Sequence, residues 1–178
     1  MPHAIFHIVF AMLIAEFIRE YVVKDKKKFS MHYVFIAGIA GALPDIDILA
    51  YWGLYFFGFS LEQVHRTFTH TLFVPLVFFI LALFTWKFKN KNLGRHHLKL
   101  HNIFLMIALG LFIHLVLDFV VSGTISPFFP LLKFSIGLNL ASLLPFPIQQ
   151  LIEPSLDAAI FIFWLFWLEY KHKLSNFI

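Results

Sequence analysis

The sequence predicts an all-α fold: a polytopic integral membrane helical bundle of about five spans, with short re-entrant or interfacial helices between them. Three observations predict this class. Hydrophobic residues make up 60% of the 178 residues, and only 13% of residues are charged. The mean hydropathy is +0.82, which does not fit a soluble domain. Several apolar stretches approach the roughly 20 residues that cross a bilayer core, and the length suits one membrane-embedded domain, residues 1–178.

These apolar stretches define the expected elements in chain order. Five of them are read as spans: residues 4–23, 31–49, 71–88, 102–122 and about 155–170. Residues 48–59 are apolar but short, which suits a re-entrant or interfacial segment. Residues 123–153 contain several prolines among apolar residues, and this pattern predicts broken or re-entrant backbone instead of a span.

Lysine and arginine gather at three ends of these spans, which orients the chain. They follow the first span, fill the connector between the third and fourth spans, and follow the last span. By the positive-inside rule, these ends face the cytoplasm. Topology therefore accounts for the net charge of +4, and we expect no nucleic-acid partner. We expect the protein in the cytoplasmic (inner or plasma) membrane among membrane lipids, and no motif identifies a protein partner.

Three polar clusters stand out in this apolar chain. They are Pro44-Asp45-Ile46-Asp47, His65-Arg66-Thr67-Phe68-Thr69-His70, and His114 with Asp118 one helical turn later. In the predicted topology all three lie toward the non-cytoplasmic face, as do His3 and His7 at the start of the first span. The i, i+4 spacing puts His114 and Asp118 on one face of a helix. Segments that are distant in sequence therefore converge at one level of the membrane.

The convergent histidines and aspartates predict a metal site. Imidazole and carboxylate bind divalent zinc, manganese and iron, and the chain has no cysteine that could offer a thiolate. Each cluster alone also fits a structural role: a helix-end turn with solvated carboxylates, an interfacial loop in which Thr69 caps a helix, or a buried hydrogen-bonded pair. The convergence of all three favours metal binding. We expect one or two divalent ions, zinc first, with manganese or iron as alternatives.

The order of these motifs resembles a known family. Four motifs carry the resemblance: an early histidine, Leu-Pro-Asp-Ile-Asp, His-Arg-x-x-Thr-His, and His-x-x-x-Asp followed by Gly123 and Pro127. In this order they are similar to the membrane-bound metal-dependent hydrolases, the LexA-binding inner-membrane-associated hydrolases of the YdjM family. The resemblance covers residues 7 to about 130, and the family is distantly like zinc-dependent phospholipases C. It implies that His7 is the early ligand. The departures from the family pattern are Thr67, Thr71 and Ile113. None of them is an expected ligand, so they bear on substrate fit more than on metal binding.

The charge and depth of the site favour a hydrolytic mechanism. The expected metal ligands are His7, Asp45, Asp47, His65, His70, His114 and Asp118. A metal held there would lower the pKa of a bound water and polarise the bond under attack, with Asp47 as the general base. The planar guanidinium of Arg66 suits a phosphate. We therefore expect a phosphoester substrate, in a lipid or another membrane-associated molecule.

Two other functions fit the same residues. A non-catalytic scaffold or partner-binding protein would use the metal for structure alone, in a closed site. A divalent-metal transporter would place histidines and carboxylates along a path through the bilayer, whereas the expected ligands gather at one face. We rank the hydrolase first, the scaffold second and the transporter third. The sequence has no His-Glu-x-x-His motif of a metalloprotease.

Overall fold

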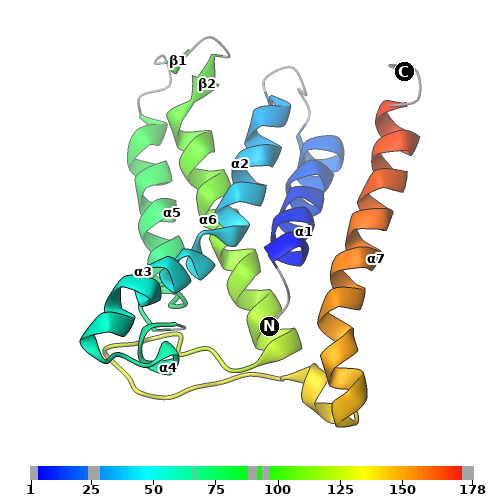
Figure 1. The fold of residues 1–178 in the computed structure, drawn as a ribbon. Helices are drawn as coiled ribbons and strands as arrows, with labels where there is room; N and C mark the ends of the chain where they lie inside the picture. The colour runs from blue at the N-terminus through cyan, green and yellow to red at the C-terminus, as the bar shows by residue number, and fades with distance from the viewer. Residues whose placement is uncertain (1–3, 24–28, 66, 88–91, 94–96, 174–178) are drawn as a thin grey trace.

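The computed structural model of the chain describes residues 4–23, 29–65, 67–87, 92–93 and 97–173. It confirms the all-α prediction (Figure 1). In this part of the chain the strands are the two-residue β1 (Asn92–Leu93) and β2 (Leu98–Lys99), which pair antiparallel at one end of the helical bundle.

The helices follow one another along the whole chain. The α-helices are α1 (Ala4–Phe17), α2 (Met31–Ala42), α3 (Asp47–Leu54), α4 (Leu61–Val64), α5 (Phe73–Trp86), α6 (Leu100–Leu117) and α7 (Phe146–His172). The π-helical segments η1 (Ile18–Val22) and η5 (Asp118–Ser122) continue α1 and α6. The 3-10 segments are η3 (Pro44–Ile46), η4 (Tyr55–Phe57) and η6 (Leu140–Leu143).

Helix α6 lies at the centre of the bundle and packs against α1, α2 and α5, while α7 packs along α1 (Figure 1). Two glycines allow close contact between α6 and α2 and between α2 and α1. A Cβ added to Gly110 on α6 would lie 2.2 Å from the carbonyl oxygen of Ala37 on α2. A Cβ at Gly41 on α2 would lie 2.7 Å from the carbonyl oxygen of His7 on α1. Because only glycine fits at such distances, these positions bring three helix backbones into contact.

Local sequence explains where several helices begin and break. Ser30 caps α2 by accepting a hydrogen bond from the backbone N–H of His32. Pro44 follows the end of α2, and the helices on its two sides are bent by 45°. Gln63 and Ser60 form a capping box at the start of α4. The bend at Pro44 places the acidic pair of the sequence, Asp45 and Asp47, at a helix junction.

Fewer helices are suited to span a membrane than the sequence predicted, so the expectation of about five spans was wrong. Among the described residues, Leu100–Val121 and α7 are long and apolar enough, and the bent pair Met31–Ala42 and Pro44–Phe57 would make a third. Helix α5 has 14 residues, which is about 21 Å of helix against a hydrocarbon core of about 30 Å. Helix α1 has 14 residues and continues through η1, but the combined stretch carries three charged residues, Glu16, Arg19 and Glu20.

The proline-rich stretch is irregular, as predicted, but shorter than predicted. Residues 123–145 cross the end of the bundle opposite β1 and β2 without an α-helix (Figure 1). Helix α7 then begins at Phe146, before the predicted start near residue 155. Proline is tolerated in a first helical turn, where its missing N–H has no partner to lose, and Pro147 occupies that turn. The helix also continues through Pro154.

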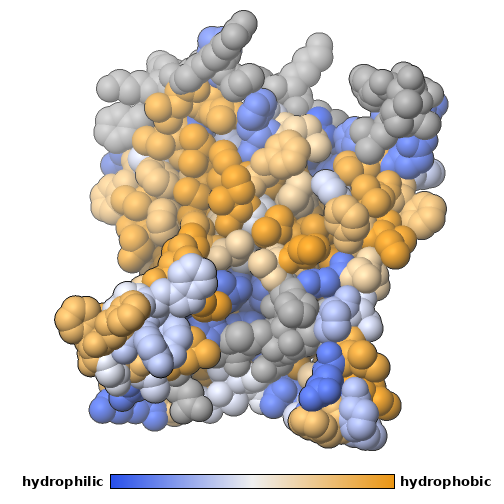
Figure 2. Space-filling model, in the orientation of Figure 1, coloured by the Kyte–Doolittle hydropathy of each residue, from blue (hydrophilic) through white to orange (hydrophobic). Residues whose placement is uncertain are grey.

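The outer surface is apolar. Figure 2 shows hydrophobic side chains over the outer faces of the helices, and exposed examples are Ile39, Phe84 and Phe166. The buried core between α1, α2 and α6 includes Met12, Tyr33 and Met106. An apolar exterior around a packed interior is what a membrane protein presents to lipid.

Candidate metal centre

Six of the predicted ligands meet at the end of the bundle where α6 ends and α3 and α4 lie. His7 comes from α1, Asp45 from η3, His114 from α6 and Asp118 from the first residue of η5. His65 and His70 come from the segment between α4 and α5. They form three overlapping groups whose ligand atoms lie within 4.8 Å of one another: His7, Asp45 and His114; Asp45, His65 and His70; and His70, His114 and Asp118.

Four atoms make the centre of this cluster. The Nε2 atoms of His70 and His114 lie 3.1 Å apart. Asp45 Oδ1 is 3.6 Å from each of these nitrogens, and Asp118 Oδ2 is 3.5 Å from His70 Nε2 and 3.6 Å from His114 Nε2. Ligands around a tetrahedral zinc ion with bonds of about 2.1 Å are separated by about 3.4 Å. These five separations therefore have the size of ligand–ligand distances around a tetrahedral metal ion.

The outer ring nitrogens of two histidines are fixed by hydrogen bonds. His114 Nδ1 donates to the carbonyl oxygen of Gly41 at 2.8 Å, because a carbonyl can only accept. Thr69 Oγ1 donates to Asp47 Oδ2 at 2.7 Å and lies 2.9 Å from His70 Nδ1, from which its oxygen accepts. In their neutral forms, both imidazoles then direct an unprotonated Nε2 toward the centre. This is the outer arrangement that orients metal-binding histidines.

Asp47 lies beside the centre and contacts the Nδ1 atoms of His65 and His70. Its Oδ1 accepts from His65 Nδ1 at 2.7 Å, and its Oδ2 is 3.4 Å from His70 Nδ1. It is not a member of the three candidate ligand groups. The sequence predicted Asp47 as a ligand and as the general base; the structure places its carboxylate where it orients His65 and His70.

Two buried nitrogens support the fit of a cation. His65 Nε2 and His7 Nδ1 are buried without a hydrogen-bond partner in the described residues. A buried polar atom left unsatisfied costs about 1–3 kcal/mol. His7 also stacks on the ring of His114, with centroids 4.0 Å apart, and its Nε2 is 3.5 Å from Asp118 Oδ1. Because Asp45 belongs to two of the three groups, the donor set has places for one ion or for two.

The carboxylates set the electrostatics of the cluster. Burial disfavours the charged form of His70, but the neighbouring carboxylates of Asp45, Asp47 and Asp118 outweigh this effect and raise its pKa. Three aspartates beside neutral imidazoles favour positive charge at this place. A divalent cation would satisfy the same preference and displace the proton.

Several further groups bear on the site. Arg66, predicted to contact the substrate, and His3 lie outside the described residues. The carbonyl of Gly41 was not predicted, because a backbone oxygen leaves no mark in the sequence. Thr69 was predicted only as a helix cap, whereas it connects Asp47 to His70. Asp157 on α7 accepts the backbone N–H of Phe6 at 2.9 Å, which holds α7 against the start of α1 beside His7.

Fold and cluster together define a class: an α-helical membrane protein with buried histidine and aspartate groups that could hold a metal ion. The YdjM inner membrane protein family matches residues 1–174, and the chain belongs to this family. This confirms the resemblance to the YdjM family and the expectation of a membrane protein. Neither a curated protein nor a solved structure matches the chain.

Proposed function

We propose that this protein is a membrane-bound metal-dependent hydrolase of a phosphoester, carried by a lipid or another membrane-associated molecule. The observation that carries the proposal is the convergence of His70, His114, Asp45 and Asp118 with separations of 3.1–3.6 Å. The ligands would be these four residues together with His7 and His65. The ion we expect is zinc, with manganese or iron as alternatives.

Access to the cluster favours catalysis over a purely structural role. A structural zinc site is closed by protein ligands, whereas a catalytic site keeps a position open. The side chains of His70 and His114 are fully buried, but that of Asp45 is 23% exposed. A cavity of about 590 Å³ adjoins the cluster and is lined in part by Asp47 and Thr69. Substrate and water could therefore approach from the side of Asp45 and Asp47.

The bound metal would supply an activated water and polarise the phosphoryl oxygen. The protein's own residues would then hold the metal, shape the access and move the proton. Asp47 lies at the wall of the cavity, and we propose that it takes the proton of the attacking water. Its hydrogen bonds to His65 and Thr69 hold it in position for this role. For Arg66 we propose a contact with the phosphate, on the strength of its place in the sequence beside His65.

The charge pattern of the sequence supports a site toward the non-cytoplasmic face. The basic connector between α5 and α6 and the basic end of α7 would lie in the cytoplasm. The metal cluster is at the opposite end of the bundle from β1 and β2, which belong to that connector (Figure 1). In this orientation the headgroup of a lipid in the outer leaflet would lie at the depth of the cluster.

The proposal is tested by hydrolysis assays on purified, zinc-loaded protein. The substrates are p-nitrophenyl phosphate, bis(p-nitrophenyl) phosphate and phospholipid vesicles. We expect turnover that a chelator abolishes, that Asp118→Ala removes, and that His32→Ala leaves unchanged, because His32 is an exposed histidine at the other end of α2. If the metal-loaded protein hydrolyses none of these phosphoesters, the hydrolase proposal is refuted and the scaffold role takes its place.

A further inference from the structure

The cavity beside the metal cluster combines an apolar lining with one polar pair that contacts the cluster. Its walls are apolar and include Leu43, Ile46, Leu54, Phe59 and Phe68. Its polar pair is Asp47 and Thr69, whose carboxylate and hydroxyl are hydrogen-bonded to each other at 2.7 Å. These two residues also contact His65 and His70 of the cluster. The cavity is therefore connected to the cluster through this pair, and the other lining residues are apolar apart from Gln63 and Thr67.

One side of this cavity is formed by α3, which together with the following η4, residues 47–57, we call the arm. The arm is suited to the membrane interface. Helix α3 and the following η4 expose large aromatic side chains: Trp52 is 64% exposed, Tyr55 61%, Phe56 85% and Phe57 79%. Tryptophan and tyrosine are enriched at the level of lipid headgroups. The arm projects from the end of the bundle (Figure 1). A cavity in this arm can take a ligand directly from the bilayer.

We propose that this cavity binds one long alkyl, acyl or isoprenoid chain of an amphiphilic phosphoester whose phosphate lies at the metal cluster. The assignment rests on the proposed function, because it places the phosphate at the metal. It adds the substrate class, a lipid with at least one long chain, and the residues that select it. A volume of about 590 Å³ is in the range of small-molecule sites.

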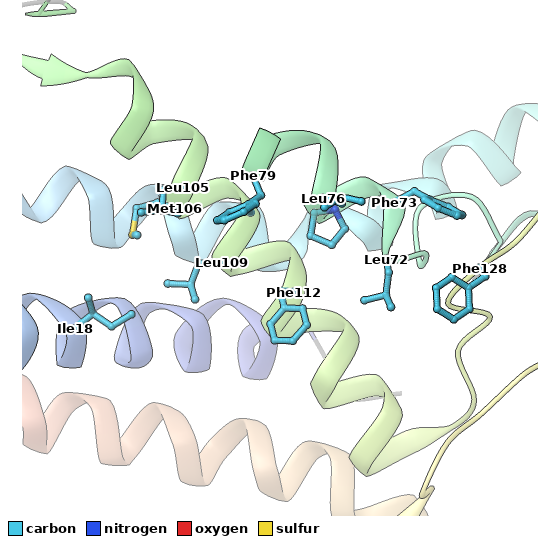
Figure 3. A pocket seen from close by; sticks show the side chains of 12 residues that line it. Ile18, Leu72, Phe73, Leu76, Phe79, Leu105, Met106, Leu109, Phe112 and Phe128 are labelled. Carbon is cyan, nitrogen blue, oxygen red and sulfur yellow. The ribbon is translucent and has the colours of Figure 1, made fainter. Parts of the chain in front are cut away.

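A second apolar groove is the competing place for the chain. It has a volume of about 630 Å³ and lies between α5 and α6, with Ile18 at one end and Phe128 at the other (Figure 3). All of its lining side chains are apolar. It offers no polar side chain that would orient a headgroup. The cavity beside the cluster instead has Asp47 and Thr69 in its lining, and these contact His65 and His70.

Cysteine protection tests the assignment without requiring catalysis. The chain contains no cysteine, so a single Ala50→Cys change in the lining of the cavity gives a unique label site. The protein is held in lipid nanodiscs, and maleimide labelling is timed with hexadecyl phosphate or with inorganic phosphate. Leu49→Cys is the matched control, since Leu49 is 55% exposed on the same helix and does not line the cavity. Leu76→Cys reports on the competing groove.

We expect hexadecyl phosphate to slow labelling of Ala50→Cys about tenfold at a free concentration about ten times its Kd. Inorganic phosphate should leave that rate unchanged, and neither ligand should affect Leu49→Cys. Unchanged labelling of Ala50→Cys with hexadecyl phosphate, equal protection by inorganic phosphate, or protection of Leu76→Cys alone would overturn the assignment. Leu54→Cys replaces Ala50→Cys as the reporter if the latter does not elute as a folded protein in size exclusion.

The two proposals fail in different ways. Protection of Ala50→Cys without hydrolysis of any phosphoester would refute the hydrolase and leave a lipid-phosphate binding site. Hydrolysis without protection would support the hydrolase and refute the cavity as the chain site.

Discussion

The Nε2 atoms of His70 and His114 face each other at 3.1 Å, although the two residues are 44 positions apart in the chain. Both outer nitrogens are engaged, His114 Nδ1 by the carbonyl of Gly41 and His70 Nδ1 by Thr69. Two unprotonated nitrogens at this distance repel each other unless a proton or a cation lies between them. Carboxylates of Asp45 and Asp118 on the same centre make a divalent cation the better occupant.

The role of Asp47 separates two interpretations of the site. As an outer partner of His65 and His70, Asp47 would orient ligands without binding the metal. Asp47→Asn should then weaken zinc affinity by about 10- to 100-fold and leave stoichiometric binding at high zinc. Competition with a chelator of known affinity measures this change. Complete loss of zinc at saturating concentration would instead make Asp47 a direct ligand.

Loss of the close contact between α2 and α6 should weaken metal binding, although Gly110 is not a ligand. Gly110→Ala places a Cβ 2.2 Å from the carbonyl oxygen of Ala37, so the helices must separate. We expect a loss of about 1–3 kcal/mol of stability and weaker zinc binding, because His114 is held by Gly41 on α2. Thermal unfolding and zinc content measure the two effects.

Gly53→Ala is the control for this change. Gly53 lies in α3, and a Cβ there meets nothing within 4 Å. Alanine has a higher helix propensity than glycine by about 1 kcal/mol, so this variant should be neutral or slightly stabilised. Equal destabilisation of the two variants would argue against helix contact as the cause.

The proposed contact of Arg66 with the phosphate rests on the sequence alone. If its guanidinium contacts the phosphate, Arg66→Ala should retain zinc and lose roughly 10- to 100-fold in kcat/KM toward an anionic phosphoester, in line with about 1.5–3 kcal/mol for a charged hydrogen bond. Lys133→Ala removes an exposed cation from the irregular segment and serves as the control. Retained zinc with unchanged kcat/KM would remove Arg66 from the mechanism.

The orientation in the membrane is tested by labelling from each side. Single cysteines at Ser60, before α4, and Asn92, in β1, lie at opposite ends of the bundle. With a membrane-impermeant maleimide and sealed cells, Ser60→Cys should react from outside, and Asn92→Cys only after the membrane is opened. The reverse pattern would place the metal cluster on the cytoplasmic side.

The sequence located the candidate ligands because charged and imidazole side chains are costly in an apolar chain, so each cluster stands out. It also predicted the irregular stretch that begins at residue 123. It overestimated the number of spans, since α5 has only 14 helical residues and α1 with its continuation η1 carries Glu16, Arg19 and Glu20. Apolar composition extends beyond the helix that forms, and hydropathy does not show where hydrogen bonding ends.

The finer division of roles within the site had no signal in the sequence. Asp45 and Asp47 are two residues apart and chemically identical, but the 3-10 turn at Pro44–Ile46 sends them to different places. Asp45 joins the centre, whereas Asp47 contacts the outer nitrogens of His65 and His70. The support from Gly41 depends on a backbone oxygen. The packing of α2 on α6 brings this oxygen to His114.

The most direct test of the metal centre is elemental analysis of the purified protein beside His70→Ala, His114→Ala and Asp118→Ala, with His32→Ala as the control. The account predicts stoichiometric divalent metal in the unmodified protein and in His32→Ala, and its loss in the three cluster variants while they remain folded. Absence of metal from the unmodified protein after reconstitution, or its retention in all three cluster variants, would contradict the account.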